Sequence, residues 1–248
     1  MIKKVVVSAA GHGTRMLQLS ENKPKHLIEI KNKPFLAYLL DHIFEAGYEE
    51  VILVVGYKQD AMKEFVASYT FDGAAQKITL VSQFEKLGTK EQGTYGTACP
   101  LMCVEELVKG EQFMSLVGDN MYSAADLRAM NVEDDFCYVG GLKHATPEKF
   151  GVLLTNGEML KEIVEKPKEF VGDLINTSLY KFTPEMFAKL PLIGKSSRGE
   201  YEITDVISLL AKEGKVKVKI IKDNWMDFGR PEDIEKFSEE FLKNEGSK

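Results

Sequence analysis

The chain has few of the residues that build disulfide frameworks or metal clusters. Its 248 residues include only three cysteines and four histidines, and an odd number of cysteines cannot all pair within one chain. Cys99, Cys103 and Cys137 stand among apolar residues, so we expect reduced core thiols and a cytoplasmic location. The first two have a spacing that metals can use, but without nearby histidines or further cysteines they fall short of a zinc set.

Long hydrophobic runs and an excess of positive charge are also missing. No window approaches the roughly 18 consecutive apolar residues of a membrane-spanning helix, and the first residues do not resemble a signal peptide. Lys and Arg number 32 against 38 Asp and Glu, a net charge of −6. This balance disfavours a broad nucleic-acid or anionic-membrane interface. We therefore expect a soluble protein with neither kind of partner.

What the sequence does have is a regular alternation of β-branched runs and amphipathic segments. Strands are expected near residues 3–9, 51–55, 78–82 and 113–117, and helices near 34–46, 59–68 and 97–108. Short connections in this order are typical of right-handed crossovers in a parallel sheet. The predicted fold class is α/β, a Rossmann-like three-layer α/β/α arrangement with a mixed, mainly parallel central sheet.

The pattern changes after about residue 140. Two apolar runs flank Asn156-Gly157, a pair that suits the positive φ angles of a type I′ hairpin turn. Further strands are expected at 174–182 and 216–221, and helices at 203–210 and 231–242. Because nothing between the halves resembles a linker, we expect residues 1–248 to form a single domain with one shared sheet.

The loop after the first strand is the first candidate site, because ligands of open parallel sheets bind beyond the carboxyl ends of the strands. It reads Ala10-Gly11-His12-Gly13-Thr14-Arg15, followed by Pro24-Lys25. The third glycine of a dinucleotide fingerprint would fall at Met16, which disfavours an NAD site. The glycines let backbone amides approach a phosphate, and Arg15 and Lys25 can neutralise a triphosphate. The alternative is a pair of solvated surface cations.

Two aspartates are candidates for binding a divalent metal ion. Asp119 follows the apolar strand at 113–117, and Asp227 follows a short expected strand containing Trp225. Both can reach the same edge of the sheet, and Mg²⁺ is usually held by one or two carboxylates together with phosphate oxygens and water. Either aspartate alone could equally be a turn or helix-cap residue, so only the pair indicates a Mg²⁺ site.

These motifs and several others, in order along almost the whole chain, resemble those of the sugar-1-phosphate nucleotidylyltransferase family, the glucose-1-phosphate uridylyl- and thymidylyltransferases among them. The matching segments are Gly11 to Arg15 with Pro24-Lys25, Gly118-Asp119-Asn120, Phe150-Gly151-Val152, Glu165-Lys166-Pro167, Asn176 to Tyr180, Gly199 to Asp205 and Trp225 to Gly229. The resemblance implies transfer of a nucleotidyl group from a nucleoside triphosphate to a sugar 1-phosphate, with Mg²⁺. Glucose 1-phosphate with UTP or dTTP is the leading substrate pair.

The resemblance also implies a role for each candidate residue. It assigns catalysis to Arg15, Lys25 and Lys166, nucleotide binding to Ala10, Gly11, Gly13, Thr14, Gln83 and Gly96, sugar binding to Asn120, Gly151, Glu165 and Asn176, and Mg²⁺ to Asp119 and Asp227. Gln83 would read the base, and Lys166 would hold the sugar phosphate. Residues up to about 140 would then bind the nucleotide, and residues from about 141 to 248 the sugar phosphate.

Departures from the family pattern leave the base and the sugar open. The link at 84–94 is long, so either Gly88 or Gly96 could meet the base, and Gly96 is favoured because it opens the next helix. Thr177-Ser178 replaces Ala-Gly beside the expected sugar site. Two alternatives are a cytidylyltransferase acting on an alcohol phosphate such as phosphocholine, and a non-catalytic regulatory homologue. A homo-oligomer is also left open.

Overall fold

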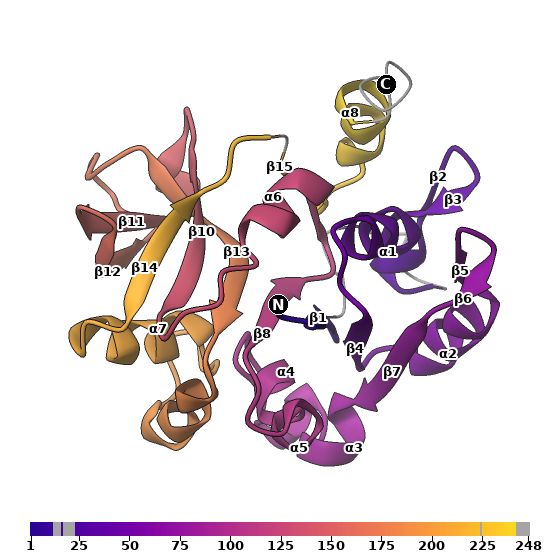
Figure 1. The fold of residues 1–248 in the computed structure, drawn as a ribbon, viewed down its shortest axis with the longest axis horizontal. Helices are drawn as coiled ribbons and strands as arrows, with labels where there is room; N and C mark the ends of the chain where they lie inside the picture. Colours follow the sequence, from indigo (N-terminus) through magenta and orange to yellow (C-terminus); the bar gives the residue numbers. More distant parts are fainter. Residues whose placement is uncertain (12–15, 17–22, 224, 242–248) are drawn as a thin grey trace.

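Four parallel strands form the first half of a nine-stranded sheet (Figure 1). The computed structural model describes residues 1–11, 16, 23–223 and 225–241. The four strands are β1 (Lys4–Ala9), β4 (Glu50–Val55), β7 (Lys77–Ser82) and β8 (Phe113–Val117), in the spatial order β7-β4-β1-β8. Strands β1 and β4 are buried on both faces, which is typical of parallel strands.

The second half of the chain extends the same sheet. Its strands are β13 (Leu174–Phe182), β11 (Gly151–Asn156), β12 (Met159–Glu165), β14 (Val216–Ile220) and β10 (Cys137–Lys143), in that spatial order from β8 outward. Strand β13 runs antiparallel to β8, with Leu179 opposite Leu116. The prediction of one shared, mixed sheet is therefore confirmed.

The sheet is mixed, and parallel pairing is concentrated in its first half. Within the described residues, the parallel pairings are β1–β4, β1–β8, β4–β7 and β10–β14, and the antiparallel pairings are β8–β13, β10–β13, β11–β12, β11–β13 and β12–β14. Parallel pairing dominates only where helices connect the strands, whereas the tight hairpin of the second half imposes antiparallel pairing.

Helices connect most of the strands. They are α1 (Phe35–Glu45), α2 (Gln59–Ser68), α3 (Gln83–Leu87), α4 (Cys99–Met102), α5 (Glu105–Val108), α6 (Ala124–Ala129), α7 (Ile203–Lys212) and α8 (Asp233–Glu240), with short 3-10 helices η2 (Lys25–Leu27), η3 (Lys90–Gln92), η4 (Pro147–Lys149) and η5 (Pro184–Leu192). The single helix predicted at 97–108 is wrong, because α4 and α5 divide it. At the break the Leu107 amide donates to the Val104 carbonyl at 2.9 Å, and the Cys103 carbonyl accepts from the Lys86 ammonium at 2.9 Å.

Three small two-stranded sheets complete the fold. They pair β2 (Glu29–Ile30) with β3 (Lys33–Pro34), β5 (Thr70–Phe71) with β6 (Ala74–Ala75), and β9 (Asn120–Tyr122) with β15 (Trp225–Asp227). The last pair joins segments about a hundred residues apart and lies close to the carboxyl end of β8.

The hairpin turn differs from the predicted one. Asn156 pairs with Met159, so the two turn residues are Gly157 and Glu158. Gly157 has φ +60°, whereas Asn156 is not among the residues with positive φ. A type I′ Asn-Gly turn would need positive φ at both of its central residues, and glycine in the first central position suits a type II′ turn instead.

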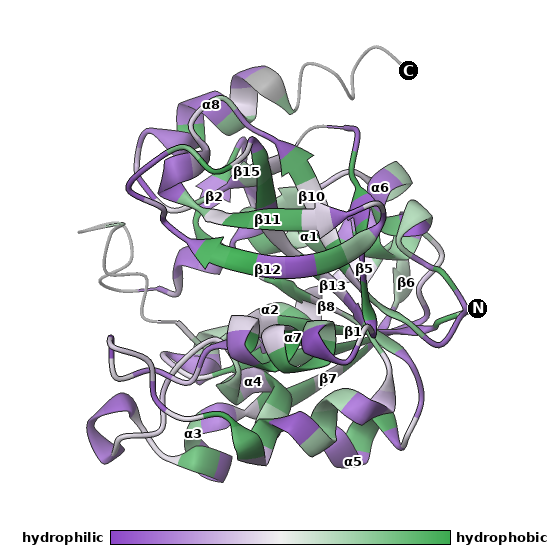
Figure 2. Ribbon diagram, turned by 90° about the vertical axis from the view of Figure 1, so that its left-hand side faces the viewer, coloured by the Kyte–Doolittle hydropathy of each residue, from purple (hydrophilic) through white to green (hydrophobic). Residues whose placement is uncertain are grey.

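Two hydrophobic cores lie on opposite faces of the sheet. Val5 and Val7 of β1 belong to one core with α1, and Val6 belongs to the other with residues around α4 and α5, as the alternation of side chains along a strand requires. Figure 2 shows α8 as a largely hydrophilic helix. It is anchored by Phe237, which is buried and whose ring centroid lies 5.4 Å from that of Phe35 in α1.

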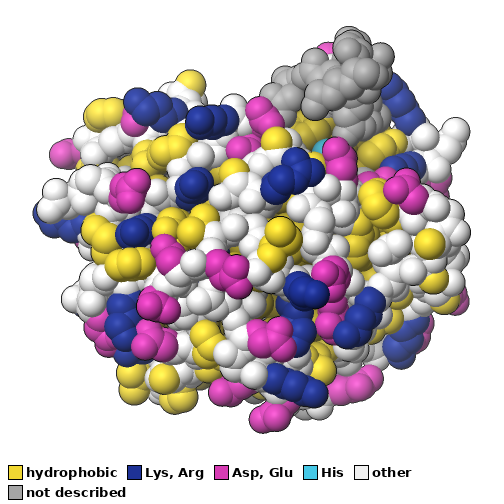
Figure 3. Space-filling view, in the orientation of Figure 1, with side chains coloured by type: hydrophobic (Ala, Val, Ile, Leu, Met, Phe, Trp, Pro, Cys, Tyr) yellow, Lys and Arg dark blue, Asp and Glu magenta, His cyan; other side chains and the backbone are white. Residues whose placement is uncertain are grey.

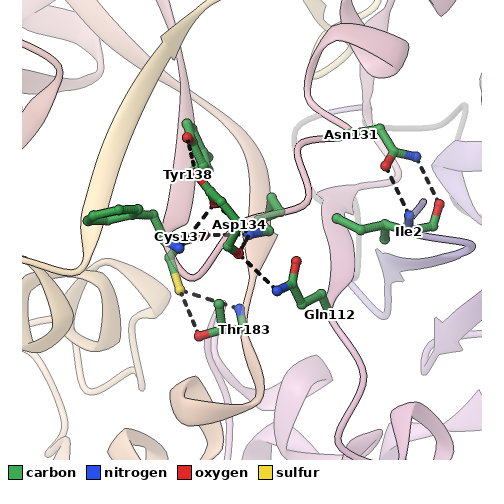
Figure 4. A network of polar contacts seen from close by, with 9 residues as sticks. Ile2, Gln112, Asn131, Asp134, Cys137, Tyr138 and Thr183 are labelled. Carbon is green, nitrogen blue, oxygen red and sulfur yellow. Dashed lines mark hydrogen bonds and ion pairs between the residues drawn. The ribbon is translucent and has the colours of Figure 1, made fainter.

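A buried lysine organises the segment that leads into β10, the segment to which Asp134 and Tyr138 of Figure 4 belong. Lys181 is completely buried, and its ammonium donates to the Asp134 and Phe136 carbonyls, both at 2.6 Å, and to the Asp134 carboxylate at 3.1 Å. Tyr138 donates to the same carboxylate at 2.7 Å. The buried charge is therefore paired and hydrogen-bonded, as its burial requires.

The three cysteines are free and buried, which confirms the expectation of core thiols. In the part of the chain that the structure describes, no helix combines the length and the apolar character needed to cross a membrane. On the face drawn in Figure 3, basic and acidic side chains are interspersed, and neither sign gathers into one large patch.

Candidate active site

A cavity of about 210 Å³ lies at the carboxyl ends of the parallel strands. Six of the predicted residues line it, namely Ala10, Gly11, Lys25, Gln83, Gly96 and Asp119. They come from the loops after β1, β7 and β8 and from η2. Segments far apart in the sequence thus converge where a parallel sheet places its ligands.

Lys25 and Asp119 form an ion pair in this cavity. Their side chains are only 10% and 20% exposed. Burial by itself would raise the pKa of the Asp119 carboxyl, but the adjacent Lys25 ammonium, together with His26 and hydrogen bonds to the carboxylate, lowers the pKa overall. Asp119 is therefore a carboxylate at neutral pH, and a cation stands beside it.

Seven residues that line the cavity were not among the sequence candidates, and His26, Tyr95 and Glu200 are the three of them that carry a titratable side chain. Burial, and then the charge of Lys25, lower the pKa of His26 to about 3, so its imidazole is neutral at physiological pH. Each of the three adjoins a residue of a recognised motif, since His26 follows Lys25, Tyr95 precedes Gly96 and Glu200 follows Gly199. That adjacency is the signal that could have found them.

Gln83 lies in the cavity wall with 1% of its surface exposed. It begins α3 and does not end the preceding strand, because the Ser82 hydroxyl accepts from the Glu85 amide at 3.2 Å and so caps the helix. Among the described residues, the Gln83 Oε1 has no hydrogen-bond partner. A buried acceptor without a partner is costly, so this amide is suited to a polar ligand.

Gly96, and not Gly88, is the glycine on the cavity wall. It has φ +140°, and a Cβ there would lie 2.2 Å from the Tyr201 carbonyl oxygen. The Tyr201 amide donates to the Tyr95 carbonyl, and the Ala98 amide donates to the Tyr201 carbonyl, both at 2.9 Å. The close approach of these two backbones requires glycine at this position.

The second aspartate lies on a strand next to Asp119. Asp227 is in β15, opposite Asn120 of β9. The amide of Phe228, the next residue, donates to the Asp119 carbonyl at 2.7 Å. Within the described residues no three His, Cys, Asp or Glu side chains form a metal-binding group. Asp119 lines the cavity, whereas Asp227 is not among its lining residues. The predicted pairing of the two carboxylates around Mg²⁺, with phosphate and water as the other ligands, therefore stays a prediction.

Strands of the second half bring the predicted sugar-binding residues together. Gly151 pairs with Glu165, and a Cβ on Gly151 would lie 3.1 Å from the Glu165 Oε2 and 3.8 Å from the Asn176 Cβ. Asn120 is buried, and its amide donates to the Thr177 carbonyl at 3.1 Å. These residues form a second polar cluster beside β9.

Lys166 lies at the end of β12, outside the residues that line the cavity. Its Nζ is 3.8 Å from the Glu165 Oε1, and the two side chains are about half exposed. Arg198 lies near this pair. A hydrogen bond from Arg198 to Glu202 raises the pKa of its guanidinium, and the negative charge of Glu165 adds to the effect. Arg198 immediately precedes the motif that begins at Gly199, but it was not recognised as a candidate from the sequence.

Known proteins with the same organisation are nucleotidyl transferases. A family model described as nucleotidyl transferase matches residues 4–244. The chain belongs to the nucleotidyl transferase family.

Its relatives agree with this assignment. The chain is 36% identical over 238 residues to the UTP–glucose-1-phosphate uridylyltransferase AglF of Haloferax volcanii, with 93% of each chain covered. It is 33% identical over 246 residues to the bifunctional protein GlmU of Methanococcus vannielii, where it covers 96% of this chain but only 55% of the relative. A structure of UDP-glucose pyrophosphorylase complexed with UDP-glucose has a TM-score of 0.83 at 23% identity, covering 98% of this chain and all of that one, which shows a shared fold.

Part of the expected nucleotidyl transferase phosphate loop is not described by the structure. Gly13, Thr14 and Arg15 lie outside the described residues, so their predicted roles stay predictions. The described part of this site combines a buried cation, an ionised carboxylate and a buried amide in one cavity. This arrangement can accept a polar, negatively charged ligand.

Proposed function

We propose that this nucleotidyl transferase transfers a nucleotidyl group from UTP or dTTP to glucose 1-phosphate, giving a nucleotide sugar and pyrophosphate. What supports the proposal is the convergence of two polar clusters: Lys25, Gln83 and Asp119 in the cavity, and Gly151 with Glu165 on the neighbouring strands. The similarity to a UTP–glucose-1-phosphate uridylyltransferase over 93% of each chain favours UTP and glucose 1-phosphate.

In the proposed reaction, a phosphate oxygen of glucose 1-phosphate attacks the α-phosphorus of the nucleotide in line. The bond to the β-phosphate oxygen breaks, and pyrophosphate leaves with that electron pair. A phosphate monoester is already a competent nucleophile, so the site has to align two anions and offset their repulsion. Lys25 and Arg15 would steady the triphosphate, and Lys166 the sugar phosphate.

Asp119 and Asp227 would hold the Mg²⁺ ion. When bound, the ion supplies positive charge that favours departing pyrophosphate. Lys25 keeps Asp119 ionised, so this carboxylate is ready for a cation at neutral pH. The residues of this chain therefore supply charge and position, and no covalent intermediate is needed.

Gln83 would read the base. Its amide offers an acceptor and two donors. Among the described residues, its Oε1 has no hydrogen-bond partner. Such a group can bond the N3–H of uracil or thymine. Ala10, Gly11, Gly13, Thr14 and Gly96 would complete the nucleotide site, and Asn120, Gly151, Glu165 and Asn176 the sugar site.

This division extends to the whole chain. Residues up to about 140 would bind the nucleotide in a Rossmann-like, three-layer half, for which the all-parallel order β7-β4-β1-β8 is the support. Residues from about 141 to 248 would bind the sugar phosphate. The cytoplasmic location and the oligomeric state stay predictions.

The test is a matrix of UTP, dTTP, CTP, ATP and GTP against several sugar 1-phosphates and phosphocholine, scored by pyrophosphate release. We expect the highest rate with glucose 1-phosphate and UTP or dTTP, and none after EDTA. The matched control is folded Asp119→Asn protein. Release from CTP with phosphocholine alone would instead support the cytidylyltransferase alternative, and a folded protein without any release would support the regulatory one.

A further inference from the structure

Strand β13 carries a bulge where it passes the predicted sugar site. Tyr180 lies opposite Val139 of β10, but Asn176 already lies opposite Gly141. The three residues between them on β13 therefore face the single residue Gly140. Bulges of this kind re-aim side chains and are frequent beside active sites.

The middle residue of this bulge, Ser178, is in the left-handed region with φ +59°. Residues other than glycine, asparagine and aspartate rarely adopt this conformation. The Asn176 Oδ1 accepts a hydrogen bond from the Ser178 amide at 2.9 Å, which helps to hold it. Glycine would fit here without strain, so a serine side chain is kept at a cost, and such strain is concentrated at functional sites.

The surroundings of Ser178 are polar and belong to the sugar cluster. Burial raises the pKa of the Tyr180 phenol to about 12, and the nearby side chains of Asn176 and Ser178 act against this rise, whereas the charge of Glu165 adds to it. The Asn176 Nδ2 donates to the same Tyr180 hydroxyl at 2.9 Å. Tyr180 is buried, whereas Ser178 is partly exposed. Ser178 is thus a partly accessible residue whose amide is bonded to Asn176, which in turn is bonded to the buried Tyr180.

We propose that Ser178 is a specificity-determining residue for the sugar. Its Oγ hydrogen-bonds a hydroxyl of glucose 1-phosphate, and its Cβ and Oγ occupy space that a larger substituent, such as an acetamido group, would need. The sugar discriminated against is therefore an N-acetylhexosamine 1-phosphate. This inference rests on the proposed function, because it assigns the sugar preference of that same site.

Two substitutions separate the hydroxyl from the bulk. Ser178→Ala keeps the Cβ and removes the hydroxyl, whereas Ser178→Gly removes both and relieves the strained backbone. Ser208→Ala is the matched control, because the Ser208 hydroxyl donates only to the Thr204 carbonyl within α7, at 2.7 Å. Thermal unfolding of each variant shows that it is folded.

The experiment measures kcat/KM for glucose 1-phosphate and for N-acetylglucosamine 1-phosphate at saturating UTP, together with KM for UTP. We expect Ser178→Gly to raise the acetamido-to-glucose ratio at least about tenfold, and Ser178→Ala to lower kcat/KM for glucose 1-phosphate about tenfold without admitting the acetamido sugar. KM for UTP should stay within about twofold of wild type. A merely structural role would change both sugars alike.

A ratio that stays within about twofold of wild type in Ser178→Gly overturns the assignment of Ser178. If the wild type releases no pyrophosphate with any sugar phosphate, the proposed function fails. In that case calorimetry on the same variants measures the dissociation constants of glucose 1-phosphate and N-acetylglucosamine 1-phosphate. The change in their ratio in Ser178→Gly then tests the role of Ser178. Absence of measurable binding of either sugar phosphate overturns both proposals.

Discussion

Each half of the sheet places a lysine beside a carboxylate, and the two pairs differ in burial. Lys25 and Asp119, in the parallel half, have side chains 10% and 20% exposed. Lys166 and Glu165, in the antiparallel half, are 56% and 50% exposed with 3.8 Å between Nζ and Oε1. A buried charge depends on its partner, whereas an exposed pair adds little to stability. The second pair is therefore free to exchange its partner for a substrate at small cost.

Strand direction explains this difference. In the parallel half, successive strands end at one edge, so the loops after β1, β7 and β8 close over one another and bury their charges. In the antiparallel half, the polar residues lie within β13 or at the ends of the hairpin β11–β12, where one face remains open. One half of the site is enclosed, and the other is an open polar surface.

The largest effect is expected from breaking the buried pair. Asp119→Asn should lower turnover by orders of magnitude while the protein stays folded. Lys25→Met should lower turnover similarly and also destabilise the protein by about 3 kcal/mol, because it leaves Asp119 charged and unpaired. Pyrophosphate release and urea unfolding measure the two effects.

The double variant Lys25→Met with Asp119→Asn is the control for this prediction. It should recover most of the lost stability but none of the activity. Folded Asp119→Asn protein that keeps full activity at limiting Mg²⁺ would reject the proposed role of this carboxylate.

The exposed pair should behave in the opposite way. Lys166→Ala should raise KM for glucose 1-phosphate about tenfold or more, since it removes a cation from the sugar phosphate. The free energy of unfolding should change by less than about 0.5 kcal/mol, and KM for UTP should stay constant. If Lys166→Ala weakened only UTP binding, the assignment of Lys166 to the sugar phosphate would be wrong.

Substitutions at two glycines test the same difference between the enclosed half and the open half of the site. Gly96→Ala places a Cβ 2.2 Å from the Tyr201 backbone, which cannot yield easily, so we expect destabilisation by more than about 1 kcal/mol. Gly151→Ala places a Cβ 3.1 Å from the Ile163 Cγ2 and 3.1 Å from the Glu165 Oε2, which is the far end of a flexible side chain and can move. It should mainly weaken sugar-phosphate binding. Urea unfolding and KM values are measured for both variants. A larger loss of stability in Gly151→Ala than in Gly96→Ala would contradict this prediction.

A smaller effect is expected at the base. Gln83→Ala should reduce the preference for UTP or dTTP over CTP by about tenfold, because one polar contact is worth on the order of 1 to 3 kcal/mol. The best rate should fall less than the selectivity. Initial rates with each triphosphate test this, and an unchanged ranking would place the base reader elsewhere, with Gln92 as the next candidate.

The smallest effect concerns the core thiols. Burial raises the pKa of Cys99 to about 12 and that of Cys103 to about 11, so both should resist iodoacetamide at pH 8 in the native protein and react in urea. In the unfolded chain these thiols ionise near pH 8.5. The native state holds their protons to higher pH, so the free energy of unfolding should fall as the pH rises above about 9. Rapid labelling of Cys99 or Cys103 in the native protein at pH 8, detected by mass spectrometry, would contradict this prediction.

Local sequence signals predicted the parallel half closely. The helix at 59–68 and the strand at 113–117 have the predicted bounds, because apolar periodicity and nearby breakers determine such elements. The position of the cavity was predicted from the rule that ligands bind beyond the carboxyl ends of parallel strands. Six of the residues that line it were among the candidates.

Features that depend on distant contacts were not predicted. The break between α4 and α5 lies where Lys86 contacts the Cys103 carbonyl, and the β9–β15 pair joins residues about a hundred apart. The bulge at Ser178 depends on the register of β13 against β10. Local propensity and hydrophobic periodicity do not contain this information, because each of these three features results from packing between segments that are far apart in the sequence.

The backbone bonds between Tyr95, Ala98 and Tyr201 also determine when the cavity can form. The Ile203 amide donates to the Thr97 hydroxyl at 2.9 Å across 106 residues, so one wall of the cavity is supplied by a part of the chain that is synthesised late. A ribosome-bound chain of the first 140 residues would have the strands of the parallel half but not this wall. The edge of β8 that later pairs with β13 would also be open to other chains. Nucleotide binding should therefore be acquired only after the second half has emerged and folded.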